Sequence, residues 1–583
     1  MHEFRVWAPR AEKSVEVVIV GRGERVAMKP RERGWWSVEV ADAGPGTDYL
    51  LSLDGGEARP DPRSMFQPEG IDGPSRVVDH SSFEWTDAAW HGIPVSSALI
   101  YEMHVGTFTS GGTFDDAIDR LGHLVDLGVN TVELLPVVEF SGDRGWGYDG
   151  VDLYAPHHAY GGPDGLKRFV DACHQRDLAV ILDVVYNHLG PAGNYLPVYG
   201  PYFTDKYGTP WGDAVNYDGA GSDEVRAFVL DNVEMWLRDY HVDGLRLDAV
   251  HAIHDESAVH LLEEMSERVD RLEAELGRSL FLIAESDLND PRFINQRELG
   301  GLGMDAQWSD ELHHALHSVL TGERSGYYAD FGSYAQLARG FERSFVYAGE
   351  YSQHRQRRHG RPPLPGTPGW RFLAYIQNHD QIGNRAVGER ITALVSHGRA
   401  KIAAALVLCS PFVPMLFQGE EWGASTPFQY FTDHPDPELG KAVSEGRRSE
   451  FSYFGWDPAD VPDPQDVGTF ERSKLDWSEL DTEAHKGFLD WHRQLIALRR
   501  SLPQLSDGRL DRVWCRFDED REWFVLGRGD LALVCNLADS AQDVALHRLP
   551  EEILIASGET ELGAAGVRIA PESAALVRLS GPG

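Results

Sequence analysis

The alternation of hydrophobic and polar positions changes character twice along the chain. Up to about residue 90, short runs such as EFRVWAP, SVEVVIV and GWWSVEV alternate in polarity and are separated by turn residues. This spacing is typical of a small β-sandwich. From about residue 505, runs such as WFVLGRG and LALVCNLA return to the same pattern. The sequence therefore predicts an immunoglobulin-like β-sandwich over residues 1–90 and a second β-sandwich over residues 505–583.

Residues 91–504 have a different pattern, in which short apolar strands alternate with amphipathic helices. One such helix is predicted over residues 222–240, with Ser222 as its N-cap and apolar residues on one face. Alternation of this kind indicates a parallel sheet, and eight strands are the number that a (β/α)8 (TIM) barrel requires. The fold class is thus α/β, a barrel between two β domains, with strands predicted at 98–105, 131–137, 179–188, 244–250, 280–286, 304–310, 371–380 and 413–421.

The stretch GLRLDAVHAI, residues 244–253, has two opposite charges inside an apolar run. Side chains alternate along a strand, so Leu245 and Leu247 point one way while Arg246 and Asp248 point the other. In a barrel the leucines would contact the surrounding helices, and the charged pair would face inward. That places the pair near the carboxyl end of the strand, where barrel active sites are built.

Other predicted strands end in the same way. Asp183 and His188 lie at the end of the third strand, Glu285 at the end of the fifth, and His379 and Asp380 at the end of the seventh. An isolated Arg–Asp pair is also open to a structural interpretation, as an ion pair that fixes strand register. Several clustered carboxylates are costly to bury, so the set as a whole favours a functional site.

Two carboxyl groups in different environments suit the hydrolysis of a glycosidic bond. One must protonate the leaving oxygen, and the other must meet the developing oxocarbenium ion. Asp248, with Arg246 beside it, is the predicted nucleophile, while Glu285 follows the apolar run LFLI, which should raise its pKa and make it the proton donor. Asp380 would hold sugar hydroxyls and offset positive charge. A retaining mechanism requires the two carboxyl groups about 5–5.5 Å apart.

Four motifs resemble the signature regions of the α-amylase superfamily, glycoside hydrolase family 13. They are DVVYNH at 183–188, GLRLDAVH at 244–251, the glutamate of LIAES, and QNHD at 377–380. The resemblance implies that Asp248 is the nucleophile, Glu285 the acid/base and Asp380 the transition-state stabiliser. It also implies a set of substrate-binding residues, namely Arg246, Asp183, His188, His251, His379 and Tyr148, the last stacking beneath the reacting glucose.

Longer stretches resemble the trehalohydrolases within this superfamily. They include RGWGYDGVDLYAPHHAYGGPDGLKRF, IAESDLNDPR, NHDQIGNRAVGER and FQGEEWGASTPFQYFTDH. This resemblance implies hydrolysis of the α-1,4 bond next to the trehalose end of maltooligosyltrehalose, with trehalose and a maltooligosaccharide as products. Two alternatives stay open from the sequence: a glycogen branching or debranching enzyme, and a glycan-binding protein without catalysis.

The excursion at 189–221, after the third strand, is rich in Gly, Pro and aromatic residues and is expected to be functional. Its Trp211 is a candidate sugar-binding platform, as are Trp146 and Trp422, although tryptophan more often packs in a core. His313 and His317 have a helical metal-binding spacing but no evident further ligand. We therefore expect no metal and no cofactor. The basic stretch at 354–366 is expected to be a solvated loop rather than a lid.

Charge and composition limit the partners. The chain has 54 Lys and Arg against 92 Asp and Glu, a formal net charge of −38, which disfavours nucleic acid and anionic membranes. The first residues lack the pattern of a signal peptide, and no apolar run is long enough to span a bilayer. The four scattered cysteines suit reduced core thiols. We therefore expect a cytoplasmic protein that binds neither nucleic acid nor membranes; the partners that the resemblance implies are maltooligosyltrehalose, trehalose and maltooligosaccharides.

Overall fold

A closed parallel barrel forms the centre of the computed structural model, which describes residues 1–453 and 460–581. Within these residues the barrel has eight strands, each inside one of the predicted segments, so the predicted barrel is confirmed. In order around the barrel they are β9 (Ile100–Met103), β10 (Thr131–Leu134), β13 (Ala179–Val184), β16 (Gly244–Leu247), β17 (Phe281–Ala284), β18 (Ala306–Trp308), β21 (Phe372–Ala374) and β22 (Val413–Phe417).

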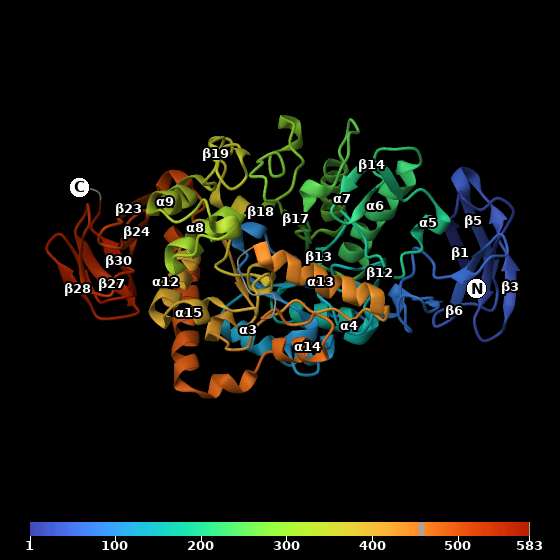
Figure 1. Cartoon of the computed structure of the whole chain (residues 1–583), viewed down its shortest axis with the longest axis horizontal. Coiled ribbons are helices and arrows are strands. Elements are labelled where there is room, and N and C mark those ends of the chain that lie inside the picture. The colour runs from blue at the N-terminus through green and yellow to red at the C-terminus, as the bar shows by residue number, and fades with distance from the viewer. Residues whose placement is uncertain (454–459, 582–583) are drawn as a thin grey trace.

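Helices surround the barrel on the outside (Figure 1). The helix predicted after the excursion is α6 (Ser222–Asp239), and its apolar face is buried as expected. Ser222 is its first helical residue and not its N-cap, because Gly221 takes the left-handed φ of 83° that turns the chain into the helix. The other main helices are α4 (Gly162–His174), α7 (Leu261–Leu276), α8 (Asp310–Thr321), α9 (Tyr334–Arg343), α12 (His397–Leu408), α13 (Pro437–Tyr453) and α15 (Glu483–Ser501).

Short helices link these elements. Those before the third barrel strand are α1 (Val105–Phe108), α2 (Phe114–Ile118) and α3 (Leu121–Leu127). Those after it are α5 (Leu196–Tyr199), α10 (His379–Gly383), α11 (Ile391–Leu394), α14 (Val467–Ser473) and α16 (Pro503–Ser506).

Antiparallel sheets flank the barrel at opposite ends of the molecule, blue and red in Figure 1. The N-terminal pair consists of β1 (His2–Trp7), β5 (Trp35–Val40) and β4 (Lys29–Pro30), and of β2 (Val15–Ile19), β3 (Glu24–Ala27), β6 (Asp48–Leu53), β7 (Ala58–Arg59) and β8 (Ser75–Arg76). The C-terminal pair consists of β23 (Val513–Asp518), β24 (Trp523–Arg528), β25 (Leu531–Asn536), β30 (Ser573–Leu579) and β27 (Pro550–Ala556), and of β26 (Gln542–Ala545), β29 (Gly566–Ile569) and β28 (Thr560–Gly563). The predicted β domains are confirmed, while their boundaries at 90 and 505 stay predictions.

The barrel wall has the orientation that alternation predicts. Leu245 and Leu247 belong to the large core shared with the helices, and Arg246 between them points inward to Asp183. A separate apolar cluster fills the barrel interior below these charges and includes Ile181, Ile283, Ile100, Phe281, Leu373, Tyr375, Val413 and Met415.

The excursion folds into α5 and a hairpin of β14 (Phe203–Thr209) and β15 (Gly212–Val215), with Trp211 in the turn. Cys173, Cys409 and Cys535 are buried as expected for core thiols, whereas Cys515 is half-buried. Among the described residues, no helix has the length and apolar character needed to cross a membrane.

Candidate active site

Arg246, on β16, is the centre of a buried charge network. Its Nη1 atom donates to Asp183 Oδ1 and Oδ2 at 2.9 and 2.8 Å and to Asp248 Oδ1 at 2.9 Å. Its Nη2 atom lies 3.9 Å from Glu285 Oε2, and its guanidinium carbon lies 4.3 Å from the Trp308 ring centroid. The Arg246–Asp248 contact expected from the sequence is present. One guanidinium thus holds three carboxyl groups from three adjacent strands.

Asp248 is fixed on both of its carboxyl oxygens. Oδ1 accepts from Arg246, and Oδ2 accepts from Asn187 Nδ2 at 2.8 Å. Asn187 also donates to the Asp248 backbone carbonyl at 2.8 Å, which ties the strand ends of β13 and β16 together. The side chain keeps 14% of its surface exposed. It is therefore oriented and still reachable, as a nucleophile must be.

Glu285 directly follows β17 and accepts a hydrogen bond at Oε2 from the Ala249 backbone N–H at 2.6 Å. Ala249 has a φ of +40°, a left-handed conformation that is uncommon for a residue with a Cβ and is often found at functional sites. Burial, joined by the carboxylates of Asp248, Asp310 and Asp380, raises the pKa of Glu285 well above its ordinary value, and Arg246 offsets only part of this. This is the direction predicted from the sequence, and it favours the protonated form that a proton donor needs.

His379 links the seventh strand to the first. Its Nδ1 lies 2.5 Å from Glu102 Oε1, and its Nε2 lies 2.7 Å from the Tyr148 hydroxyl, which itself donates to Asp183 at 2.6 Å. Because that hydroxyl has a single proton, His379 Nε2 must be the donor, and both ring nitrogens then carry hydrogen. Burial works against this cation, but Asp380 and Glu102 outweigh it and raise the pKa of His379 to about 9. The Tyr148 and His379 rings stack at 5.2 Å.

Two further acids of the site have contrasting environments. Burial, with the nearby Asp248 charge, raises the pKa of Asp183 to about 6 even though Arg246 and His379 favour its ionised form. Asp380 is 43% exposed, with Oδ1 3.5 Å from His379 Nε2 and 3.3 Å from Asn384 Nδ2. Asp380 is thus the acid most open to a ligand.

His188 and Trp211 stack face to face, with ring centroids 4.3 Å apart. Trp211 is 49% exposed and lines a cavity of about 500 Å³ beside the site, together with Asp149 and, from the N-terminal β region, Arg10. Of the three tryptophans considered as platforms, Trp211 is the exposed one. Trp146 and Trp422 are not platforms, because their rings are buried and their indole N–H groups donate to Gln429 O and Glu479 Oε2.

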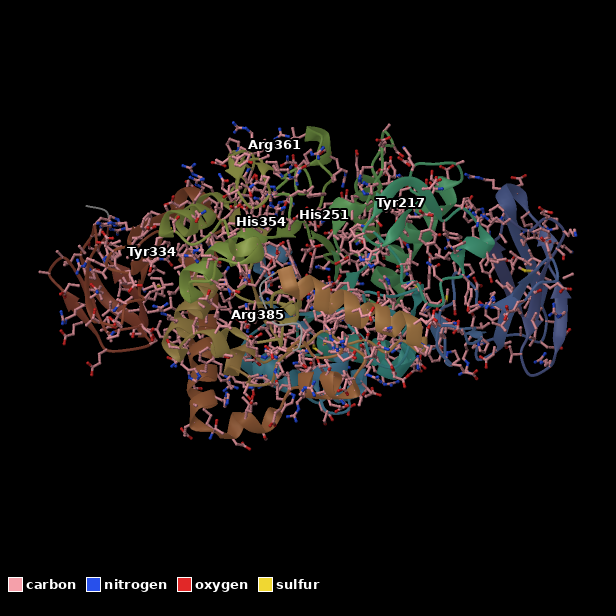
Figure 2. The ribbon with its side chains drawn as sticks, viewed as in Figure 1. Tyr217, His251, Tyr334, His354, Arg361 and Arg385 are labelled. Atoms are coloured by element: carbon pink, nitrogen blue, oxygen red, sulfur yellow. The ribbon has the colours of Figure 1, made fainter. Side chains whose placement is uncertain are left out.

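His251 is exposed on the short segment Val250–Ala252 after β16, and no contact joins it to Asp248 or Glu285. Burial raises the pKa of the nearby Asp287, but Arg355, with a smaller effect from His251, outweighs it and lowers that pKa. Arg355 donates to Asp287 at 2.9 Å, so the basic stretch at 354–366 reaches the strand end that carries Glu285. Figure 2 shows His251 and His354 in the upper middle of the molecule, between its two β-rich ends.

The helical pair His313 and His317 binds protein partners, Tyr328 at 2.9 Å and Glu323 at 2.8 Å, in keeping with packed histidines. Among the described residues, a single cluster has metal-ligand geometry, and it consists of Glu139, His157 and His158, outside the site.

Three acids of the barrel, two buried and one half-buried, were missed from the sequence. Glu102 and Glu133 face each other on β9 and β10, and Asp310 follows β18. Burial, with Glu102 and Asp183 nearby, raises the pKa of Glu133 well above its ordinary value, while burial raises that of Asp310 to about 6. The inward acid inside an apolar strand, the signal that identified Asp248, is also present at Glu102 in LIYEMHV and at Glu133 in TVELLPV.

Comparisons with known proteins agree with this geometry. The family described as the alpha amylase catalytic domain matches residues 78–197, and a domain of unknown function, DUF3459, matches residues 508–577. Malto-oligosyltrehalose trehalohydrolases from Arthrobacter ramosus and Rhizobium sp. are 52% and 49% identical to the chain, covering 99% of it and 99% and 97% of their own lengths. A crystal structure of a putative alpha amylase from Salmonella typhimurium superposes with a TM-score of 0.90 at 38% identity, covering 99% of this chain and 97% of that one.

The closed barrel with carboxyl groups clustered at its mouth, together with the matched catalytic domain, defines a glycoside hydrolase of the α-amylase family. Identity of about half over nearly the whole length then narrows the family. The chain belongs to the malto-oligosyltrehalose trehalohydrolases.

Proposed function

We propose that the protein hydrolyses the α-1,4 bond next to the trehalose unit of maltooligosyltrehalose, with retention, and releases trehalose and a shortened maltooligosaccharide. One observation carries the chemistry: the Asp248 and Glu285 carboxyl groups lie beside the same buried guanidinium, at 2.9 and 3.9 Å, and burial raises the pKa of Glu285. An ionised acid and a protonated acid side by side are what a retaining glycosidase uses. The names of the full-length relatives support this choice of substrate.

Each catalytic step is assigned to one of these groups. Asp248 attacks the anomeric carbon and forms a glycosyl ester, while Glu285 gives its proton to the glycosidic oxygen so that trehalose leaves. The Glu285 carboxylate then takes a proton from water, the water attacks the anomeric carbon, and Asp248 is freed. Arg246 orients the Asp248 carboxyl group for attack through its hydrogen bond to Oδ1. Asp380, the exposed acid, accepts hydrogen bonds from sugar hydroxyls and balances the positive charge of the transition state.

The remaining predicted residues line the sugar path in this proposal. Tyr148, stacked on His379, forms the floor beneath the reacting glucose, and Asp183 and His188 border it. Trp211 offers an exposed ring for a sugar beyond the reacting one, and the exposed His251 is a further substrate-binding residue. The free thiols support a reducing compartment, and we assign the protein to the cytoplasm on that ground.

The test is product analysis with matched substrates. Maltotriosyltrehalose, a plain maltooligosaccharide of the same length and a branched glucan are each incubated with the full chain. We expect rapid release of trehalose from the first, with the new reducing end in the α configuration by NMR, and much slower cleavage of the other two. Faster debranching or branch transfer than trehalose release would replace the proposal by the glycogen-enzyme alternative.

A further inference from the structure

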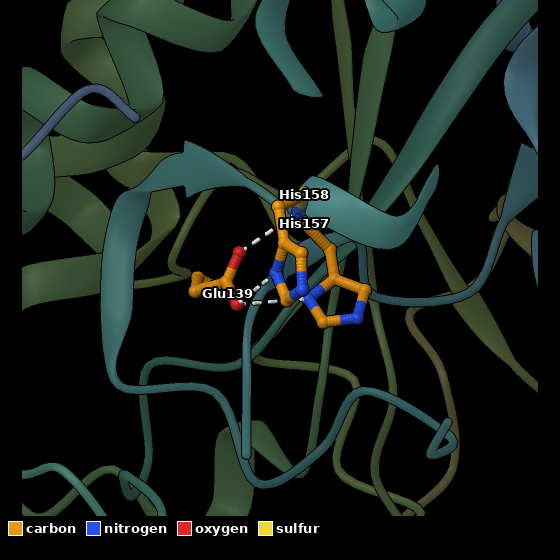
Figure 3. A group of neighbouring side chains, drawn as sticks. All are labelled: Glu139, His157 and His158. Carbon is orange, nitrogen blue, oxygen red and sulfur yellow. Dashed lines mark hydrogen bonds and ion pairs between the residues drawn. The ribbon is translucent and has the colours of Figure 1, made fainter. Parts of the chain in front are cut away.

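A second cluster of ionisable side chains lies at the base of the loop that carries Tyr148. Glu139 ends β11 (Val138–Glu139), His157 follows β12 (Asp152–Pro156), and His158 begins the short helix His158–Tyr160. One oxygen of Glu139 and one nitrogen of each histidine all lie within 4.8 Å of one another. Figure 3 shows both imidazole rings beside the carboxylate. The Glu139 and His157 side chains are completely buried, and His158 is 24% exposed.

Hydrogen bonding accounts for only part of this cluster. His158 is well bonded, with Nδ1 2.7 Å from Glu139 Oε1 and its backbone N–H donating to Oε2 at 2.9 Å. His157 Nδ1 lies 3.1 Å from the same Oε1, yet neither of its buried ring nitrogens makes a hydrogen bond. Asp152, opposite Glu139 in the β-ladder, also has a buried oxygen, Oδ2, without a hydrogen-bond partner. Buried polar atoms in proteins normally have a hydrogen-bond partner or a ligand, so these atoms are available to bind one.

We propose that Glu139, His157 and His158 bind a divalent transition-metal ion such as Zn²⁺. Two imidazole nitrogens and one carboxylate oxygen are a common zinc ligand set, with metal–ligand distances of about 2.0–2.2 Å. Tetrahedral coordination at that distance puts neighbouring ligand atoms about 3.3 Å apart, close to the 3.1 Å between Glu139 Oε1 and His157 Nδ1. The 2.7 Å contact of His158 must open by a few tenths of an ångström. This proposal departs from the absence of a metal expected from the sequence.

The nitrogen and oxygen atoms of the proposed ligands favour some divalent ions over others. Imidazole nitrogen suits Zn²⁺, Co²⁺ and Ni²⁺, whereas Ca²⁺ and Mg²⁺ prefer shells made of oxygen. A fourth ligand is available from water.

The position of the cluster gives the ion a structural role. Glu139 precedes residues 140–151, and His157 and His158 follow the strand that returns from them, so the ion would clamp both ends of this loop. The loop carries Tyr148, which donates to Asp183 in the active site. The ion therefore acts as a clamp on the loop and takes no part in the chemistry. Binding of the ion itself does not depend on the proposed function.

The first experiment measures binding to the full chain after treatment with a chelator. ZnCl₂ is titrated calorimetrically, and CoCl₂ is followed by its visible absorption and by X-ray absorption at the cobalt edge. We expect one ion per chain, two imidazoles in its shell, a raised Tm, and slower hydrogen exchange of residues 140–151. MgCl₂ and CaCl₂ are expected to produce none of these changes.

Variants decide which residues are the ligands. His158→Ala and Glu139→Gln should each weaken Zn²⁺ binding by at least about 100-fold, the upper range for losing even an outer partner of a metal ligand. His317→Gln is the matched control, since it removes a His–Glu pair of similar length, 2.8 Å, and should bind Zn²⁺ like the unaltered chain. Zn²⁺ uptake by the unaltered chain tests the proposed site without any variant. No stoichiometric Zn²⁺ uptake, or uptake that survives in both variants, would overturn the proposal.

Discussion

Two layers of the barrel interior lie on the same strands and have opposite character. In the lower layer Ile181, Ile283 and their neighbours form a closed apolar cluster. Two residues further along each strand, Asp183 and Glu285 point into the same interior but enter the network around Arg246. The lower layer is filled by hydrocarbon side chains, while the upper layer is filled by charged groups arranged around Arg246.

In this fold the lower layer supplies stability and the upper layer supplies the chemistry. Burying apolar surface stabilises the barrel without specifying any chemistry. Burying carboxyl groups costs free energy, and that cost appears as the raised pKa of Asp183, Glu133 and Glu285. Apolar burial in the lower layer therefore offsets the free-energy cost of burying the carboxyl groups in the upper layer, where burial raises the pKa of the proton donor Glu285.

The largest expected effect comes from replacing one carboxyl group of the upper layer by an amide. Asp248→Asn and Glu285→Gln should each lower kcat on maltooligosyltrehalose by at least about 10⁴-fold, because each removes one of the two reacting groups. Ile283→Val, two residues before Glu285, is the control in the lower layer. It should cost about 0.5–1.5 kcal/mol of unfolding free energy and leave kcat nearly unchanged. Steady-state kinetics and denaturant unfolding check both halves, and a large kcat loss in Ile283→Val would contradict the separation.

The second test removes the Arg246 guanidinium from the upper layer. Arg246→Met should lower the free energy of unfolding by about 3–5 kcal/mol at pH 8, where Asp183 and Asp248 are left as buried, unpaired charges. The loss should shrink at pH 5. Asp183, with a pKa of about 6 in the folded protein, is then largely neutral and no longer needs a counter-charge. Denaturant unfolding at the two pH values measures the difference, and an equal loss at both would show that Arg246 is not balancing these acids.

The third test overfills the lower layer. A Cβ added at Gly244 would lie 2.3 Å from Phe281 Cε2 on the next strand, so Gly244→Ala should cost about 1–3 kcal/mol of unfolding free energy. Adding Phe281→Leu should recover part of that loss, because the smaller side chain vacates the space. Thermal or denaturant unfolding of both single variants and the double variant gives the coupling. Strictly additive losses would mean that the two residues do not share this contact.

The smallest expected effect is a shift in pH dependence. Burial is the main cause of the high pKa of Glu285, and the Asp310 carboxylate adds to it. Asp310→Asn should lower the Glu285 pKa and move the alkaline limb of kcat/KM down by about half a pH unit. Tyr375→Phe is the control, since it removes the 2.5 Å hydrogen bond to Asp310 and keeps the charge. An unmoved or raised limb in Asp310→Asn would contradict this electrostatic assignment.

The barrel and the core of its site were accessible from the sequence because two strong local rules apply. Alternation placed Leu245 outward and Arg246 inward, and the ends of the strands located Asp248, Glu285 and Asp380. The same alternation was present at Glu102 and Glu133, so these two residues were missed by an incomplete application of the rule and not for lack of a signal.

Other features depend on contacts between distant parts of the chain. Arg246 pairs with Asp183 because β13 and β16 are neighbours in a register that sets these two residues opposite each other, and barrel closure alone fixes that register. Trp211 stacks on His188 only after the excursion folds into its hairpin. Trp146 and Trp422 look equally suitable in the sequence, but tertiary packing buries them.

The proposed mechanism depends on a covalent glycosyl ester formed on Asp248. A fluorinated maltosyl fluoride, which reacts with the nucleophile and then hydrolyses slowly, is incubated with the protein, followed by peptide mass spectrometry. We expect one maltosyl-type adduct per chain, on the peptide that contains Asp248, and none in Asp248→Asn. An adduct on Asp183 or Asp380, or rapid turnover of the reagent by Asp248→Asn, would contradict it.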